Sequence, residues 1–201
     1  MYEMFFGAGY FNQNLNTWDV SKVENIGGVF AHAISFNGDV AVWDTSSATY
    51  MSGMFYSAPS FDQSLNSWNT SRVTNMAFML DGADEFNSDV TSWNVSSVTD
   101  MSAMFYYATS FDQSLNAWET SHVNKMYFMF GLAESFNGYA NDWDVSSVTD
   151  MDFMFSNATF FDQSLCWDVA TKHTWSMFKG SLGCIKNNTQ CCRICDEELL
   201  N

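Results

Sequence analysis

The sequence has little of several features that would narrow its function. Proline occurs once, at Pro59, and no cysteine precedes Cys166. Only Lys22, Arg72 and Lys125 are basic in that stretch, although the whole chain carries a net charge of −16. No uninterrupted run of about 20 apolar residues occurs, so no membrane span is predicted. A surface this acidic repels nucleic acid and anionic lipid, and we expect neither as a partner.

Catalytic and cofactor motifs are also missing. The histidines, His32, His122 and His173, have no serine or cysteine partner in a recognisable motif. Gly27-Gly28 is isolated, so no glycine-rich phosphate loop is indicated. The sequence therefore predicts a protein that is not an enzyme and that uses no cofactor and no metal.

What the sequence does contain is a repeat of 25 residues, in which alanine and phenylalanine recur from Ala8 and Phe11 onward. A fixed period of this length is typical of solenoids, in which each unit buries its apolar face against its neighbours. About seven units would then share one core. We expect that core to hold two sets of aromatic residues: Trp18, Trp43, Trp68, Trp93, Trp118, Trp143, Phe61, Phe86, Phe111 and Phe136.

Each repeat combines two local patterns. Apolar residues from Val73 to Ala83 are spaced by three or four, which predicts a short helix with Ser71 as its N-cap. The segment 61–65 that precedes it is short and polar between apolar ends, which predicts a parallel strand. The predicted fold is an α/β solenoid, a leucine-rich-repeat-like stack with a short strand and a short helix per turn. The alternative is an all-β solenoid.

Polar residues also follow the repeat. Asp62, Asp112 and Asp162 alternate with Asn37, Asn87 and Asn137 at one position, so the unit of duplication spans 50 residues. A calcium site needs several oxygens converging within a few residues, whereas mixed Asn and Asp favour ladders of side-chain hydrogen bonds. We interpret the alternation as packing between neighbouring turns or as duplication history, rather than as spaced functional groups.

The ends of the repeat array differ. The chain opens partway through a repeat at Met1, without a polar capping segment, so residues 1–165 are predicted as a solenoid that lacks an N-terminal cap. Trp167 comes one residue early and breaks the period. Residues 166–201 are therefore predicted as a degenerate last repeat and a cysteine-rich C-terminal cap.

The run Val98-Thr99-Asp100-Met101-Ser102-Ala103-Met104-Phe105, with Ala108, Phe111-Asp112-Gln113-Ser114-Leu115 and Trp118, resembles the BspA-like surface-protein repeat. That leucine-rich-repeat-related family occurs in mycoplasma surface lipoproteins and in secreted proteins of microalgae. The resemblance covers residues 1 to about 181 and implies a secreted or cell-surface location without supplying catalytic residues. It also implies that Cys166 and Cys184, which flank a last repeat like that of microalgal members, form a disulfide.

The tail leaves two further features. Cys191, Cys192 and Cys195 allow one more pair and one odd thiol, and their pairing stays open. A zinc site at Cys192 and Cys195 is disfavoured because no second pair lies at a matching distance. Asn187 in Asn187-Asn188-Thr189 is the best glycosylation candidate.

Three functions fit these patterns. The first is an extracellular or surface-exposed scaffold that uses a regular solenoid face to bind a protein or an extracellular matrix polymer. The second is a structural subunit docked in a larger assembly. The third is a binder of polysaccharide or of an ice lattice. The sequence favours the first and identifies neither the partner nor the face that binds it.

Overall fold

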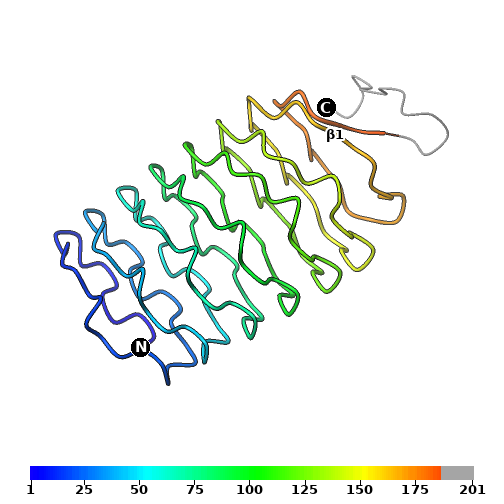
Figure 1. Cartoon of the computed structure of the whole chain (residues 1–201). Coiled ribbons are helices and arrows are strands. Elements are labelled where there is room, and N and C mark those ends of the chain that lie inside the picture. Colours follow the sequence, from blue (N-terminus) through cyan, green and yellow to red (C-terminus); the bar gives the residue numbers. More distant parts are fainter. Residues whose placement is uncertain (187–201) are drawn as a thin grey trace.

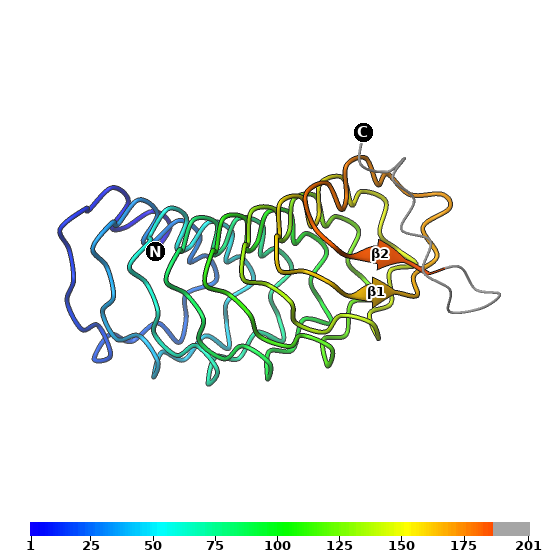
Figure 2. The ribbon, with the colours of Figure 1, turned by 90° about the horizontal axis from the view of Figure 1, so that it is seen from above.

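The computed structural model describes residues 1–186, which form a row of stacked coils with one repeat per coil (Figures 1 and 2). Parallel bridges join equivalent residues of successive coils, from Asn25↔Tyr50 to Asp150↔His173. The first coil lies at one end of the row, and the last coil lies at the other, where β1 and β2 are drawn. The prediction of a repeat protein is therefore confirmed.

The predicted fold class is wrong. Residues 1–186 contain no helix, and their strands are only β1 (Ser164–Leu165) and β2 (Cys184–Ile185), which pair in parallel. The chain is consequently neither an α/β solenoid of the leucine-rich-repeat type nor the all-β alternative, because most of it consists of turns and irregular segments. A strand was expected in every repeat and occurs only where the last two coils meet.

A ribbon of consecutive turns replaces the predicted helix. In the turn segment 51–61, the amides of Met54, Ala58 and Phe61 donate to carbonyls three residues earlier, at 3.3, 3.1 and 3.1 Å. The amides of Gly53 and Phe55 instead donate to the next coil, each at 2.9 Å. An α-helix requires bonds to the residue four earlier within the same segment. Because alternate amides bond outside the coil, the segment cannot be helical.

The backbone conformation explains why the spacing was misleading. The turn segment has left-handed residues four apart, at Gly53 with φ of 61° and Ser57 with φ of 52°, as type II turns require at their third residue. Each turn brings the chain back to the core after three or four residues. An amphipathic helix has the same apolar spacing, so hydrophobic pattern alone does not separate the two structures.

The polar segment 62–71 and its equivalents form the predicted ladder. Asn37 Oδ1 accepts from the Asp62 amide at 3.0 Å, and Asp62 Oδ1 accepts from the Asn87 amide at 2.9 Å. The same bond recurs from Asn12 to Asn37 and onward to the amide of Asp162. Asn and Asp both supply this oxygen, which is why either residue serves.

Glutamine alternates with a small residue, Gly38, Ser88 or Gly138, at one position of neighbouring coils. A Cβ added to Gly38 would lie 2.1 Å from the carbonyl oxygen of Gln13, and one at Gly138 would lie 2.2 Å from that of Gln113. In coils that carry glutamine at this position, the side chain forms a hydrogen bond to the preceding coil. Gln63 Nε2, for example, donates to Asn37 Oδ1 at 2.9 Å. Close approach of the preceding coil accounts for glycine at positions 38 and 138, whereas Ser88 stands at the third such position and donates its hydroxyl to Asp62 Oδ1 at 3.0 Å. The interpretation of the alternation as packing or duplication stays a prediction.

The serines predicted as helix N-caps have another role. Ser71 donates both its amide, at 3.1 Å, and its hydroxyl, at 2.7 Å, to Asn69 Oδ1. Ser21 and Ser96 donate in the same way to Asp19 and Asn94. Each serine therefore completes a turn in which the side-chain oxygen of the Asn or Asp two residues earlier accepts its hydrogen bonds. The N-cap prediction is wrong.

Candidate functional site

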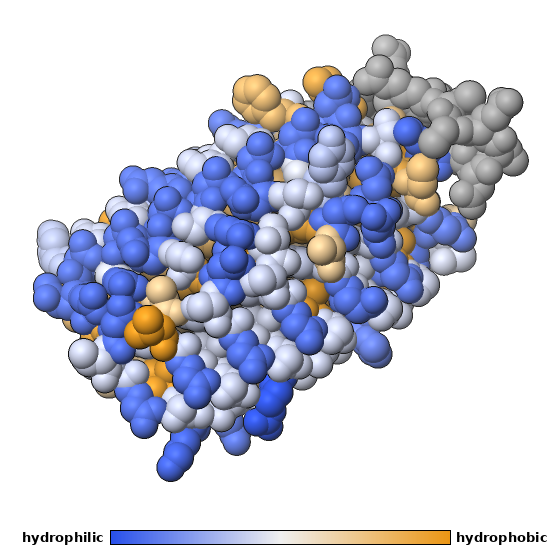
Figure 3. Space-filling view, in the orientation of Figure 1, coloured by the Kyte–Doolittle hydropathy of each residue, from blue (hydrophilic) through white to orange (hydrophobic). Residues whose placement is uncertain are grey.

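The turn segments expose a surface that we call the turn face. It consists of the side chains at the positions of Tyr2, Glu3 and Phe6 in each coil, which alternate along the chain with buried residues such as Met51 and Met54. Many of these outward positions are aromatic: Tyr2, Phe6, Tyr56, Phe78, Tyr106, Tyr127, Phe128, Phe153 and Trp175. The face drawn in Figure 3 is mostly hydrophilic, with scattered hydrophobic residues.

Toward the C-terminal end the rings pack on one another. Phe128 stacks on Phe153 with centroids 4.5 Å apart, and Trp175 meets Phe153 edge-on at 4.7 Å. Tyr127 and Tyr106 contact Phe128 edge-on at 4.6 and 5.1 Å. These contacts cover part of the aromatic surface, while Trp175 stays 64% exposed and Tyr127 38% exposed.

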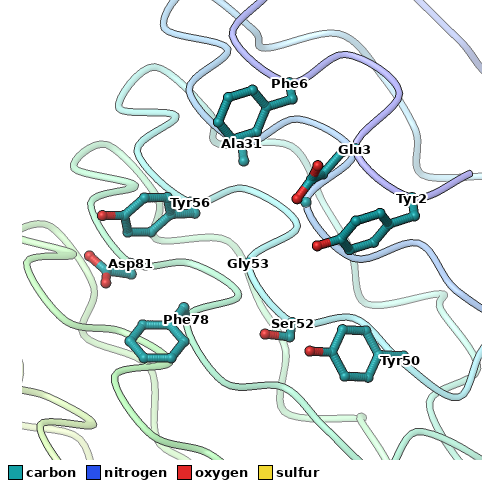
Figure 4. Close-up of a pocket in the computed structure, with 11 residues that line it drawn as sticks. Tyr2, Glu3, Phe6, Ala31, Tyr50, Ser52, Gly53, Tyr56, Phe78 and Asp81 are labelled. Carbon is teal, nitrogen blue, oxygen red and sulfur yellow. The ribbon is translucent and has the colours of Figure 1, made fainter.

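Toward the N-terminal end the rings surround a groove instead. The groove has a volume of about 320 Å³, and Figure 4 shows its lining side chains. Its walls come from four successive coils: Tyr2, Glu3, Phe6, Tyr50, Tyr56, Phe78 and Asp81. Phe78 is 43% exposed and Phe6 is 55% exposed. Large apolar side chains left this open around a concave site are typical of binding surfaces.

Glycine opens the floor of the groove. Gly28 and Gly53 occupy the left-handed position that Phe78 occupies in the next coil, with φ of 60° and 61°. A Cβ at Gly28 would lie 2.8 Å from Glu3 Cγ. Gly28 is itself buried under the Glu3 side chain, so the part of the floor that glycine leaves open lies at the half-buried Gly53.

Asp81 is the unusual charged residue of the groove. It is 9% exposed, and burial raises the pKa of its carboxyl to about 7. Among residues 1–186, no hydrogen bond or ion pair compensates its side chain. The pKa of the neighbouring Tyr106 is raised chiefly by burial of its phenol and, to a smaller extent, by the carboxylate of Asp81. Asp81 thus holds an uncompensated acidic group at an aromatic surface.

The tryptophans predicted as core residues line the interior. Trp43, Trp68, Trp93, Trp118 and Trp143 are 3–4% exposed, whereas Trp18 on the first coil is 36% exposed. Trp93 Nε1 donates to the Leu65 carbonyl of the preceding coil at 2.9 Å, and the other four buried indoles bond in the same manner. Trp118 and Trp143 stack with centroids 6.2 Å apart. The indole nitrogens are thereby satisfied inside the core.

The predicted phenylalanines form a second internal stack. Phe61, Phe86, Phe111 and Phe136 are fully buried, and successive rings lie about 6 Å apart, as in the 6.0 Å between Phe61 and Phe86. Each also contacts a ring or aliphatic side chain of its own turn segment, such as Phe55 at 3.7 Å from Phe61. None of these groups reaches the turn face.

The cysteine prediction concerns the last two coils. Cys184 lies buried in β2 opposite Ser164, whose Oγ is 3.5 Å from Cys184 Sγ, while Cys166 follows β1 and is exposed. Within residues 1–186 no disulfide joins Cys166 and Cys184, so their pairing stays a prediction for thiol titration to test. Asn187, Cys191, Cys192 and Cys195 lie outside the described residues.

The sequence does not indicate the groove, because its residues stand at positions that vary from coil to coil. The position of Phe78 holds glycine in the two preceding coils and phenylalanine again at Phe128 and Phe153. The position of Asp81 holds tyrosine in both neighbouring coils. This variability distinguishes the outward positions from the fixed columns of the core.

The comparisons place this repeat architecture in a family. A family model described as "Mycoplasma protein of unknown function, DUF285" matches residues 1–93 and 81–190, and the chain belongs to that family. The match confirms the coarser part of the resemblance, a mycoplasma-type repeat protein. No curated protein matches the chain. Among the described residues there is also no helix with the length and apolarity that crossing a bilayer demands.

Proposed function

We propose that this protein is a non-catalytic binding protein that holds a basic segment of a partner protein on its turn face. The observation that carries the proposal is the groove, where aromatic rings from four coils surround the carboxylates of Glu3 and Asp81. The likeness to BspA-like repeats supports an extracellular or cell-surface setting and an adhesive role for that binding.

Charge favours a cationic occupant. The chain has 23 acidic residues against 7 lysines and arginines, so its field attracts basic partners before contact. A lysine or arginine over Tyr50, Tyr56 or Phe78 would gain a cation–π attraction of about 0.5–2 kcal/mol. The same cation would compensate Asp81, whose burial otherwise disfavours ionisation. A neutral sugar would benefit from the rings but not from the buried charge.

The proposal predicts a definite pH dependence. A cation binds the ionised form of Asp81, and the pKa of that carboxyl is about 7 in the unliganded protein. Affinity should therefore be highest above about pH 7 and should fall as the pH is lowered through this value, because binding must then displace a proton.

The test uses a short oligoarginine peptide and isothermal titration calorimetry. Phe78→Ala leaves the net charge unchanged and should weaken binding by about fivefold or more, since one cation–π contact is lost. Its matched control is Phe153→Ala, which removes a turn-face ring outside the groove. Asp81→Asn should also weaken binding and abolish the pH dependence. Asp62→Asn removes the same charge from the polar ladder and should have little effect.

Two results would overturn the proposal. If Asp81→Asn and Asp62→Asn lost equal affinity for the peptide and Phe78→Ala lost none, binding would depend on the overall charge and not on the groove. Binding of neutral oligosaccharides that depends on Phe78, without peptide binding, would assign the groove to a polysaccharide instead.

A further inference from the structure

Three potential metal ligands meet at the other end of the turn face. Asp150, Asp152 and His173 each offer one ligand atom, and these atoms all lie within 4.8 Å of one another. The geometry points to a site for a divalent first-row transition metal such as Zn²⁺, which would join the last two coils. This site is independent of the groove and of the function proposed for it.

The backbone sets the register of the three side chains. Asp150 and His173 are partners in a parallel bridge, and the Met151 amide donates to the His173 carbonyl at 2.8 Å. Bridge partners on adjacent strands lie about 4.8 Å apart, so their side chains project side by side. The same column shows that such side chains meet, because Lys125 Nζ lies 3.3 Å from Asp100 Oδ2.

Backbone amides orient both carboxylates. Asp150 Oδ1 accepts from the Asp152 amide at 3.0 Å, and Asp152 Oδ1 accepts from the Trp175 amide at 2.6 Å. Each carboxylate keeps a second oxygen with which to bind a metal. Hydrogen bonds that fix the ligands in this way are the usual outer shell of a metal site.

The nearby cations are directed elsewhere. Lys125, on the other side of Asp150 in its column, forms its salt bridge with Asp100. Lys172 donates its ammonium to the carbonyl oxygens of Ser146 and Val148, at 3.0 and 2.8 Å. Neither lysine pairs with Asp150 or Asp152, so these two carboxylates are left to attract a metal cation.

Two departures from the repeat coincide here. Earlier coils have small or uncharged residues where Asp152 stands: Gly27, Ser52, Ala77, Ser102 and Tyr127. His173 occupies the position of Asn25 and Asn75. Among residues 1–186 no second group of three such side chains converges. The expectation of a protein without metal arose because the ligands are split between a regular and a degenerate coil.

The ligand set indicates the class of metal. One imidazole with two carboxylates suits zinc, iron or nickel, whereas calcium takes six to eight oxygen ligands. Three protein ligands would leave a further position for water. Because the ligands come from two coils, a bound metal would cross-link the last coil to the rest of the stack and raise its stability.

The experiment is a Zn²⁺ titration of the full chain by calorimetry after removal of metal with EDTA. Thiols also bind zinc, so every protein carries Cys191→Ser, Cys192→Ser and Cys195→Ser. The expected result is one Zn²⁺ per chain and a higher Tm. His173→Asn and Asp152→Ser install residues that other coils hold at these positions, so both should fold. Each should lower the Zn²⁺ affinity at least about tenfold and remove the rise in Tm.

His122→Ala, which removes an exposed histidine on another coil, serves as the control and should bind like the parent. Co²⁺ gives a second readout, since nitrogen and oxygen ligands produce no thiolate charge-transfer band. Zinc binding that is unchanged in His173→Asn, or absent from the parent, would overturn the assignment. A thiolate band would place the metal on Cys166 or Cys184 instead.

Discussion

The turn segment and the polar segment of each coil follow different rules. In the polar segment, each side-chain oxygen accepts an amide of the next coil, so only Asn or Asp occupies the ladder position from Asn12 to Asn137. On the turn face, equivalent positions hold residues as different as Glu3, Gly53 and Phe78. Backbone hydrogen bonds join the turn segments of neighbouring coils. Their outward side chains are consequently free to carry function.

The largest effect should separate the interior from the turn face. Trp93→Ala empties a buried site and removes the bond to the Leu65 carbonyl, so we expect a loss of about 3–5 kcal/mol in the free energy of unfolding. Trp175→Ala, at a residue that is 64% exposed, should cost about 1 kcal/mol or less. Urea unfolding of both variants measures the difference. Similar losses would contradict the division between core and surface tryptophans.

Asp81 provides a test through pH. Its pKa of about 7 in the folded state lies above the ordinary 3.8, so the folded protein keeps a proton that the unfolded chain releases. Stability should therefore decline as the pH rises from about 4 to 7, by up to about 4 kcal/mol. Asp81→Asn should flatten this part of the curve and raise stability above about pH 7 relative to the parent.

Thermal unfolding across the pH range gives the measurement, and Asp62→Asn is the control for loss of one carboxylate. If the stability of the parent fell no more steeply with rising pH than that of Asp81→Asn, a compensating partner of the Asp81 carboxylate would be indicated, and the prediction would be wrong.

The ladder can be broken without touching the core. Asp112→Ala removes the acceptor for the Asn137 amide, which lies 2.8 Å away, and should cost about 0.5–1.5 kcal/mol. Asp112→Asn retains the oxygen and should stay within about 0.5 kcal/mol of the parent. Chemical denaturation compares the two. If both variants lost the same stability, charge rather than the shared oxygen would define the ladder.

The smallest effect concerns the left-handed turns. Tyr107 has φ of 57° and occupies the position of Gly7 and Gly82. Tyr107→Gly should be more stable than Tyr107→Ala by about 1 kcal/mol, because only glycine adopts this conformation without a steric penalty. At Thr109, which has no positive φ, the order should reverse. The Tm of the glycine and alanine variants is compared at each position. If the alanine variant had the higher Tm at both, the left-handed turn at Tyr107 would be refuted.

The period, the stacked core and the ladder follow from the sequence alone. Trp68 and Phe61 return at one spacing because each coil must present the same apolar surface to the next, and Asn37 and Asp62 alternate because both offer the same oxygen. Composition and spacing contain that information directly, without any knowledge of how the backbone is folded between the columns.

The backbone conformation and the two sites, in contrast, depend on how the coils stack. The spacing of Met51, Met54, Phe55 and Ala58 suits a helix as well as consecutive turns, and the choice depends on amides that bond to the neighbouring coil. Phe78 and Asp81 line one groove with Tyr2 and Glu3 only because coils stack, and His173 lies beside Asp150 only through the register of the last coil. Contacts between residues of different coils depend on the stacking register, which no local sequence pattern specifies.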